Sequence, residues 1–134
     1  MKTQSFSNNT NHRLILPVFQ DVRLAENDSY ELGEERIIRF KGAEIGTATV
    51  RAVKYFPFGQ LTEPYSWAIV GKGLYYFRKM LMRFYPGVTE RSRMALVTWE
   101  WQKRDMTALS EMMRDYWMGQ LNLAGVAEEV TTLD

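Results

Sequence analysis

The chain has 134 residues, of which 46% are hydrophobic and 25% charged, and its formal net charge is +1. This balance predicts one folded domain with a modest core and excludes a mainly disordered chain. No apolar run reaches the roughly 18 residues of a membrane-spanning helix, and the polar N-terminus lacks the apolar core of a secretory signal. The absence of cysteine excludes disulfides and thiolate metal sites. We therefore expect a cytoplasmic protein with no membrane association.

The near-neutral total charge hides an uneven distribution. Residues 64–104 carry eight basic and two acidic side chains, whereas residues 105–134 carry one basic and six acidic ones. Clustered positive charge is the usual mark of a surface that binds a polyanion. A solvated helix face followed by an acidic tail produces the same pattern, so both interpretations stay open at this point.

The beginning of the chain gives weak structural signals. Residues 1–12 are polar and are expected to form a flexible N-terminal segment. Pro17 interrupts any helix over residues 13–19 and favours extended backbone just before it. Extended chain is expected to continue over residues 21–24.

Two strands are predicted next, over residues 36–41 and 44–55. The second is rich in β-branched and small side chains, and its alternating residues give it at least one apolar face. Gly46 inside this strand indicates a bulge or a close approach of another backbone segment.

The second half of the chain predicts helices around one further strand. A short helix begins near residues 62–64 and is separated by residues 71–73 from a longer helix over residues 74–85. Residues 94–101 alternate as a strand. Thr107 can cap a final helix that extends to about residue 123, before an acidic tail.

Short strands mixed with helices around glycine-bearing turns favour the α+β class. We expect a small β-barrel or a strongly bent, mainly antiparallel sheet with packed helices and an extra C-terminal helix. The expected organisation is the flexible segment over 1–12, one domain over 13–101, and a C-terminal helical extension with its acidic tail over 102–134.

Several short pieces of sequence occur in a fixed order between residues 33 and 101. They are Gly33-Glu34, Ile37–Phe40, Ile45–Val50, Leu61-Thr62-Glu63, Phe84–Gly87 and Val97–Trp101. In this order and spacing the chain resembles the ASCH family, small domains related to the RNA-binding PUA fold. The resemblance covers roughly residues 13–101. It implies a small PUA/ASCH-like β-barrel with helices packed at its ends, and a nucleic acid or nucleoside as ligand.

The Gly-x-Lys-x-x-x-x-Arg motif of that family is largely lost. In the matching register Leu16 stands at the glycine, Val18 at the lysine and Arg23 at the arginine. Asp21 stands where the small amidohydrolase members, which deacetylate N4-acetylated cytidine, have a threonine, and their downstream glutamate falls at 68–71, where none stands. Valine supplies neither a base nor an oxyanion stabiliser, so no catalytic residue is assigned. An amidohydrolase acting on a modified cytidine remains an alternative.

A basic and aromatic surface is the main candidate binding site. Cations suit phosphates, and exposed rings suit unpaired bases. The candidate ligand-binding residues are Arg23, Lys72, Tyr75, Arg78, Lys79, Arg83, Arg91 and Arg93. With the resemblance, this pattern favours a non-catalytic domain that binds RNA or a nucleotide. Half-buried tyrosines and solvated arginines are the plain structural alternative.

No metal site and no cofactor are expected, because His12 is the only histidine and no cysteine accompanies it. The predicted C-terminal helix carries an apolar face that includes Met113, Trp117 and Leu121. Such a face docks on its own domain or meets a protein partner. A protein-interaction domain, or a homodimer formed through these three residues, is therefore a further alternative.

Overall fold

The computed structural model describes residues 1–7 and 10–123 of the chain. Over these residues it is an α+β structure, with five strands, three α-helices and two short 3-10 helices. The strands are β1 (Thr3–Phe6), β2 (Val18–Leu24), β3 (Glu35–Phe40), β4 (Ala43–Pro57) and β5 (Arg93–Arg104). The helices are η1 (Thr10–Ile15), η2 (Phe58–Gln60), α1 (Glu63–Val70), α2 (Leu74–Phe84) and α3 (Met106–Leu123). The predicted α+β class with a C-terminal helix is confirmed.

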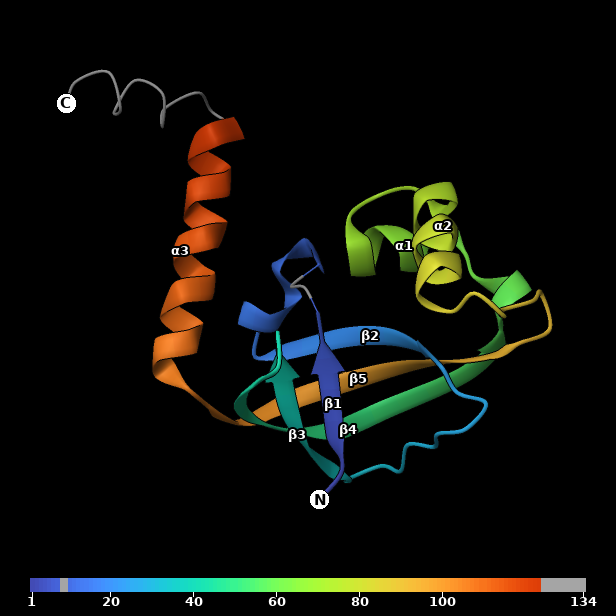
Figure 1. Cartoon of the computed structure of the whole chain (residues 1–134), viewed down its shortest axis with the longest axis horizontal. Helices are drawn as coiled ribbons and strands as arrows, with labels where there is room; N and C mark the ends of the chain where they lie inside the picture. The colour runs from blue at the N-terminus through green and yellow to red at the C-terminus, as the bar shows by residue number, and fades with distance from the viewer. Residues whose placement is uncertain (8–9, 124–134) are drawn as a thin grey trace.

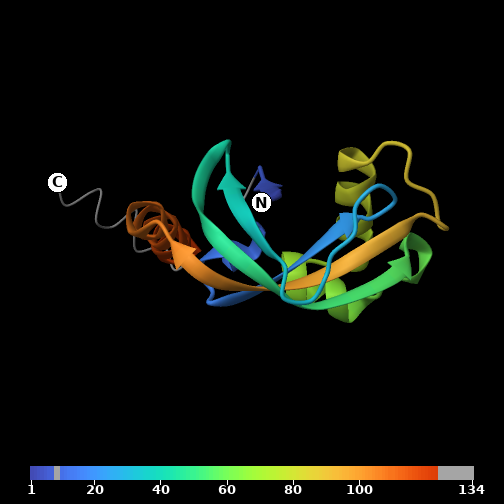
Figure 2. The same ribbon diagram turned by 90° about the horizontal axis from the view of Figure 1, so that it is seen from below.

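The strands form one sheet in the order β1-β3-β4-β5-β2. β1 runs parallel to β3, and the other neighbours are antiparallel. The long strands β4 and β5 span the molecule, and the sheet curls around them into a half-barrel, as Figure 2 shows. The strongly bent, mainly antiparallel sheet expected from the sequence is therefore present.

The curvature of β4 has a local cause at its N-terminal end. Gly46 has φ 149°, and the pairing between β4 and β5 shifts register between Thr47 and Ala48. A β-carbon built on Gly46 would lie 1.9 Å from the carbonyl oxygen of Lys103 on β5. Such irregularities bend a strand and increase its twist. The close backbone approach predicted at Gly46 is confirmed.

The alternation of β5 divides the core into two clusters. Ala95, Val97 and Trp99 are fully buried in a cluster that includes residues of β1, β2, β3 and β4. Met94 and Leu96 point to the opposite face and pack in a second cluster with α1 and α2. A strand with both faces buried explains the nearly continuous apolar sequence of its first half.

The helices lie at opposite ends of the β4–β5 pair. Figures 1 and 2 show α1 and α2 together at one end, while α3 continues from β5 at the other and stands apart from them. The helix begins at Met106, and the carboxylate of Asp105 caps it, accepting hydrogen bonds from the backbone N–H groups of Thr107 (2.9 Å) and Ala108 (3.0 Å). Asp105, not the expected Thr107, is thus the capping residue. No helix among the described residues is long and apolar enough to span a membrane.

β1 is a strand that the sequence does not predict. It lies within the segment 1–12 that was expected to be flexible, yet its backbone pairs with β3 and its Gln4 and Phe6 side chains are buried. Gln4 is stable in the interior because its amide donates to Asp21 (3.2 Å) and Tyr30 (3.3 Å). Those partners come from distant parts of the chain, so no local pattern signals the strand.

A buried arginine ties β3 to the loop before it. The Arg36 side chain is 1% exposed and donates to Asp28 (3.0 and 3.2 Å) and to Glu34 (3.0 Å). It also donates to the carbonyl oxygen of Ser29 (2.8 Å) and to the side chain of Gln4 (3.1 Å). The guanidinium is therefore satisfied on all sides, as a buried charge requires.

This cluster predicts acid sensitivity. Burial alone would raise the pKa of Asp28 and of Glu34, but hydrogen bonds and charge from Arg36 outweigh it and hold both pKa values below their ordinary range. Carboxyls with lowered pKa values contribute stability above their unfolded-state pKa, and that contribution is lost as the pH falls through the folded-state pKa. We expect the wild type to lose stability below about pH 4, measured as the urea midpoint at successive pH values.

The matched comparison is the double variant Asp28→Asn/Glu34→Gln. It should be less stable than the wild type near neutral pH, with the difference shrinking below about pH 4, where the wild-type carboxyls also become neutral. Glu44→Gln, at an exposed position, is the control and should follow the wild-type curve. A difference that does not change with pH would contradict the assignment.

Candidate functional site

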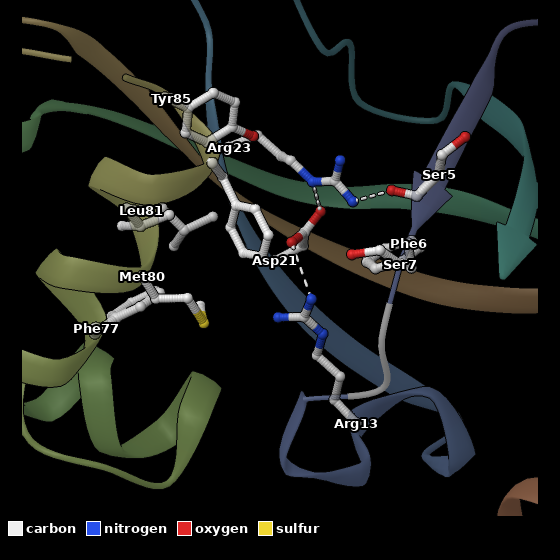
Figure 3. Close-up of a pocket in the computed structure, with 12 residues that line it drawn as sticks. Ser5, Phe6, Ser7, Arg13, Asp21, Arg23, Phe77, Met80, Leu81 and Tyr85 are labelled. Carbon is white, nitrogen blue, oxygen red and sulfur yellow. Dashed lines mark hydrogen bonds and ion pairs between the residues drawn. The ribbon is translucent and has the colours of Figure 1, made fainter. Parts of the chain in front are cut away.

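A cavity of about 160 Å³ lies where the two edges of the half-barrel come together (Figure 3). Residues 5–7 at the end of β1 form one wall, and residues 21–23 of β2 form another. Arg13 of η1 contributes from below in the view of Figure 3, and the second half of α2 with Tyr85 closes the far side. The site is thus assembled from four segments of the chain.

Side chains bridge the seam between β1 and β2, the two edge strands of the sheet. An Nη atom of Arg23 donates to the backbone carbonyl of Ser5, and the amide of Gln4 reaches Asp21 at 3.2 Å. The rings of Phe6 and Phe19 pack edge to face, 5.9 Å between centroids. The cavity therefore lies beside a seam that side-chain contacts hold together.

One aspartate is shared by two arginines at the centre of the cavity. Asp21 is 2% exposed, and Figure 3 shows Arg23 and Arg13 reaching its carboxylate from opposite sides, at 2.7 and 3.4 Å. Both guanidiniums also lie over the Phe6 ring, at 4.7 and 5.2 Å from its centroid. Two positive charges against one negative charge leave the polar side of the cavity cationic.

The two arginines differ in how well their charges are stabilised. For Arg23, burial lowers the pKa, but the charge and hydrogen bond of Asp21 and smaller contributions outweigh it, so the pKa is raised. For Arg13, burial lowers the pKa, and Asp21 restores only part of it while Arg23 lowers it further. The Nε atom of Arg13 is buried without a hydrogen-bond partner in the described part of the chain. Arg13 would therefore gain most from an anion in the cavity.

The opposite wall is apolar and aromatic. Phe77 and Leu81 of α2 are buried against the sheet, whereas Phe84, one turn further along, is half exposed at the cavity. This is the stripe that the spacing of residues in the 74–85 segment predicts. Tyr85 follows directly where the helix ends, and it also lines the cavity. A flat apolar group could lie against these rings while its polar part faces Arg13 and Arg23.

Of the eight binding residues predicted from the sequence, one, Arg23, is among the residues that line this cavity. On α2, Lys79 lies over the ring of Tyr75 at 5.4 Å, and Tyr75 is 77% exposed. Lys72, in the loop before α2, lies over the Tyr76 ring at 5.2 Å. These groups form a solvent-facing basic and aromatic surface on α2 and the loop before it, outside the cavity.

The remaining predicted residues lie in other directions. Arg78 pairs with Glu90 and lies over the Phe58 ring at 4.6 Å, so its charge is partly neutralised. Arg83 and Arg91 are exposed. Arg93 stacks on Tyr55 at 3.8 Å and lines a separate shallow depression with Lys2 and Asp28. The structure does not bring all eight residues to one surface.

Arg13 and Asp21 are central to the cavity, and sequence reasoning did not propose either as a binding residue. Asp21 and Arg23 are two apart on one strand, so they share a face, and that spacing could have indicated an ion pair. Arg13 lies in η1, and no local pattern indicates that this turn returns to β2.

The cavity offers few groups for acid–base chemistry. Its ionisable lining residues are Arg13, Asp21, Arg23 and Tyr85. Val18, at the position of the family lysine, is half exposed and lies outside the cavity lining. Within the described residues, no group of three or more His, Asp or Glu side chains is placed to hold a metal ion.

No protein-family model and no curated protein sequence matches the chain. Among solved structures, the fold is similar to that of protein EF3133 from Enterococcus faecalis V583, a protein with the family label DUF984. The TM-score is 0.58 at 14% sequence identity, and the alignment covers 75% of this chain and 76% of that chain. At this identity the similarity shows the fold alone. The fold is consistent with a small PUA-like or ASCH-type domain, and membership of the ASCH family stays a prediction.

Proposed function

We propose that this protein binds a nucleotide or RNA, without catalysis of its own, through the cavity at the β1–β2 seam. The observation that carries the proposal is the pair of arginines sharing one aspartate, opposite an aromatic wall. A nucleotide combines the two matching chemistries, an anionic phosphate and a flat, largely apolar base.

The arginines are suited to the phosphate. Guanidinium groups present several donors in a fixed plane and hydrogen-bond to phosphate oxygens with charge assistance. Asp21 uses only part of the donor capacity of Arg13 and Arg23, and the Nε atom of Arg13 is still without a partner in the described structure. An incoming phosphate would take up the remaining donors of the two guanidinium groups and balance the excess positive charge.

The aromatic wall is suited to the base. Stacking of a base on an aromatic side chain contributes about 1–3 kcal/mol, and it tolerates different bases. Phe84 is the exposed ring of this wall, and Tyr85 beside it is partly buried. For a longer RNA, Lys79 and Arg83 on the solvent side of α2 would continue the contact to further phosphates.

The contacts of Asp21, the only carboxylate among the residues that line the cavity, favour binding over hydrolysis. Asp21 is held by both arginines and by Gln4, so it is poorly placed to act as a base. No lysine or glutamate is among the residues that line the cavity.

The test is fluorescence anisotropy with short single-stranded and hairpin RNAs and with cytidine monophosphate as competitor. Three or four phosphate contacts predict that affinity for single-stranded RNA falls roughly 20- to 50-fold between about 50 and 200 mM salt. Replacing Arg13 or Arg23 by glutamine should each reduce affinity about tenfold or more, since a hydrogen bond to a charged group contributes about 1.5–3 kcal/mol.

Arg51→Gln is the matched control. It removes the same charge from an exposed position on β4, where Arg51 pairs with Glu100, and should leave affinity nearly unchanged. Lys79→Gln/Arg83→Gln tests the helix surface separately and should weaken RNA more than the mononucleotide. If neither RNA nor the mononucleotide binds at tens of micromolar (about 10–100 µM), the proposal fails. If only the helix variant matters, the cavity is not the site.

A separate observation favours a second role, contact with another protein through α3. Trp117 is 58% exposed on that helix, next to further exposed apolar side chains. This surface lies at the far end of the molecule from α1 and α2 (Figure 1), and its use would not exclude a ligand in the cavity.

A further inference from the structure

The charge of the cavity lining can be counted from its side chains. The charged residues among them are two arginines and one aspartate, Arg13, Arg23 and Asp21, so the formal charge of the lining is +1. The walls formed by residues 5–7 and by α2 contribute no charged side chain. Both arginines keep their protons, because a guanidinium is not deprotonated in a protein. The lining is therefore matched to one negative charge on a ligand.

Charges outside the lining change this balance little. Lys79 and Arg83 lie on the solvent side of α2, where water and salt screen them. His12 is the only histidine of the chain, and it packs on Tyr116 of α3 and is not among the lining residues. Tyr85 belongs to the lining, but a phenol carries no charge at neutral pH.

The three charged groups are largely withdrawn from water. The side chains of Arg13 and Arg23 are 13% and 24% exposed, and that of Asp21 is 2% exposed. In such a site the attraction for an anion grows in proportion to its charge, whereas the cost of removing it from water grows with the square of its charge. A second negative charge would also lie near Asp21 without a further cation to balance it. The site therefore favours an anion with one charge over an anion with two.

Arg13 is the arginine that can turn most readily to a ligand. Its Nη atom lies 3.4 Å from the Asp21 carboxylate, longer than a usual hydrogen bond, whereas Nε of Arg23 lies at 2.7 Å. Figure 3 shows the Arg13 guanidinium in the space between β1 and α2. Asp21 keeps its hydrogen bonds from Arg23 and Gln4 when Arg13 contacts a ligand.

The cavity is too small to enclose a whole nucleotide. Its volume is about 160 Å³, whereas pockets that enclose small molecules measure about 300–1,000 Å³. A cavity of about 150 Å³ holds a single six-membered ring. The rest of a nucleotide must then lie outside, beyond the half-exposed ring of Phe84. A continuing strand satisfies this condition, since it can enter without a free end.

We propose that the cavity takes an internal phosphodiester of a nucleic-acid strand, which carries one negative charge, in preference to the phosphate of a free nucleotide or of a strand end. A phosphate monoester carries a charge of about −1.5 to −2 at neutral pH. The inference rests on the proposed function and adds to it the form of phosphate that is recognised. Phospholipid headgroups also contain a phosphodiester, but they lack a flat ring to lie against Phe84.

The first test compares uridine monophosphate with its phosphate methyl ester, as competitors of a labelled single-stranded RNA. The methyl group leaves the base and the ribose unchanged and reduces the phosphate to one charge. At about pH 8 the ester should bind at least about tenfold more tightly, and at about pH 5.5, where the monoester is mostly singly charged, the difference should fall to about twofold. Uridine is used because its base does not titrate in this range, and any protonation of His12 affects both ligands alike. A monoester that binds as tightly as the ester at the higher pH would overturn the proposal.

Adding one cation to the lining should change the preference. Ser7→Lys raises the formal charge from +1 to +2 at an exposed position of the lining, so the advantage of the ester at about pH 8 should drop below about threefold. Gln60→Lys is the matched control, because it adds the same charge at an exposed residue outside the lining, and it should keep the wild-type ratio. An unchanged ratio in Ser7→Lys would contradict a preference set by the charge of the lining.

A strand-level test uses a three-uridine RNA with free hydroxyl ends, whose phosphates are all internal. Adding a terminal phosphate should change its affinity by no more than about twofold, and a tenfold gain, about 1.4 kcal/mol, would overturn the inference. Glycerophosphocholine, a phosphodiester without a flat ring, should compete at least about tenfold more weakly than the methyl ester. Equal competition would point to a lipid headgroup and overturn the assignment to a strand.

The outcomes separate this inference from the proposed function. If the labelled RNA itself does not bind, the proposed function fails and the inference falls with it. If the RNA binds and the doubly charged phosphate is preferred, the inference fails while the proposed function stands.

Discussion

Replacing Gly46 by alanine should destabilise the fold by about 3 kcal/mol or more, combining backbone strain with overpacking. Its φ of 149° lies in a region that side chains rarely adopt. An added β-carbon would lie 1.9 Å from the carbonyl oxygen of Lys103, 2.9 Å from its carbonyl carbon and 3.0 Å from Cα of Arg104. All three atoms are backbone of β5, so no flexible side chain can move aside. The two longest strands of the sheet would have to separate.

The measurement is urea unfolding followed by circular dichroism, with two other glycines as controls. Gly42 has φ 83° with nothing within 4 Å of an added β-carbon, so Gly42→Ala reports backbone strain alone. At Gly87 the surroundings are open and no positive φ is present, and Gly87→Ala should be close to neutral. If Gly46→Ala costs no more than Gly42→Ala, the clash with β5 is absent.

The second large effect is expected for Arg36→Leu, at about 3 kcal/mol. Removing one member of a buried ion pair costs about 3–5 kcal/mol, because the remaining charges lose their partner. The lower end applies here because Asp28 is 38% exposed and Glu34 is 20% exposed, so water can partly replace the guanidinium. The buried amide of Gln4 and the carbonyl of Ser29 also lose a donor.

Arg51→Leu is the matched control, because Arg51 and Glu100 form an ion pair that is about half exposed. Such surface pairs contribute about 0–1 kcal/mol. Arg36→Lys should fall between the two, since it keeps the charge and loses the planar set of donors. The unfolding free energies of the three variants, measured at neutral pH, give the comparison. An Arg36→Leu variant as stable as Arg51→Leu would show that the cluster contributes little.

The elements with strong periodicity could be predicted from the sequence. The stripe of α2, the alternation of β5 and the glycine within β4 all follow from spacing and side-chain type, and the structure contains them. The position of α3 along the chain was predicted, but the side of the helix that packs on the domain was not. Met112 and Ala108 are among the residues that face the domain. Periodicity does not distinguish two adjacent apolar faces of one helix, so the covered face could not be predicted.

The cavity could be predicted only in part, because distant segments create it. Arg23 was identified through the family resemblance. The partners of Asp21 come from η1, β1 and β2, and only the last is visible in a local pattern. The burial of Arg36 was missed for the same reason, since a lone arginine in a strand resembles any solvent-facing residue. Buried polar clusters depend on tertiary partners, which spacing alone does not specify.

The strand order also determines when the cavity can form during protein synthesis. β2 carries Asp21 and Arg23, and among the described strands it pairs only with β5, which comes last of them in the sequence. Contacts between distant segments form slowly because a long loop must first close. While the ribosome is still making the middle of the chain, the arginines of the cavity have no completed sheet to hold them. The cavity therefore cannot be complete until β5 has emerged and paired with β2.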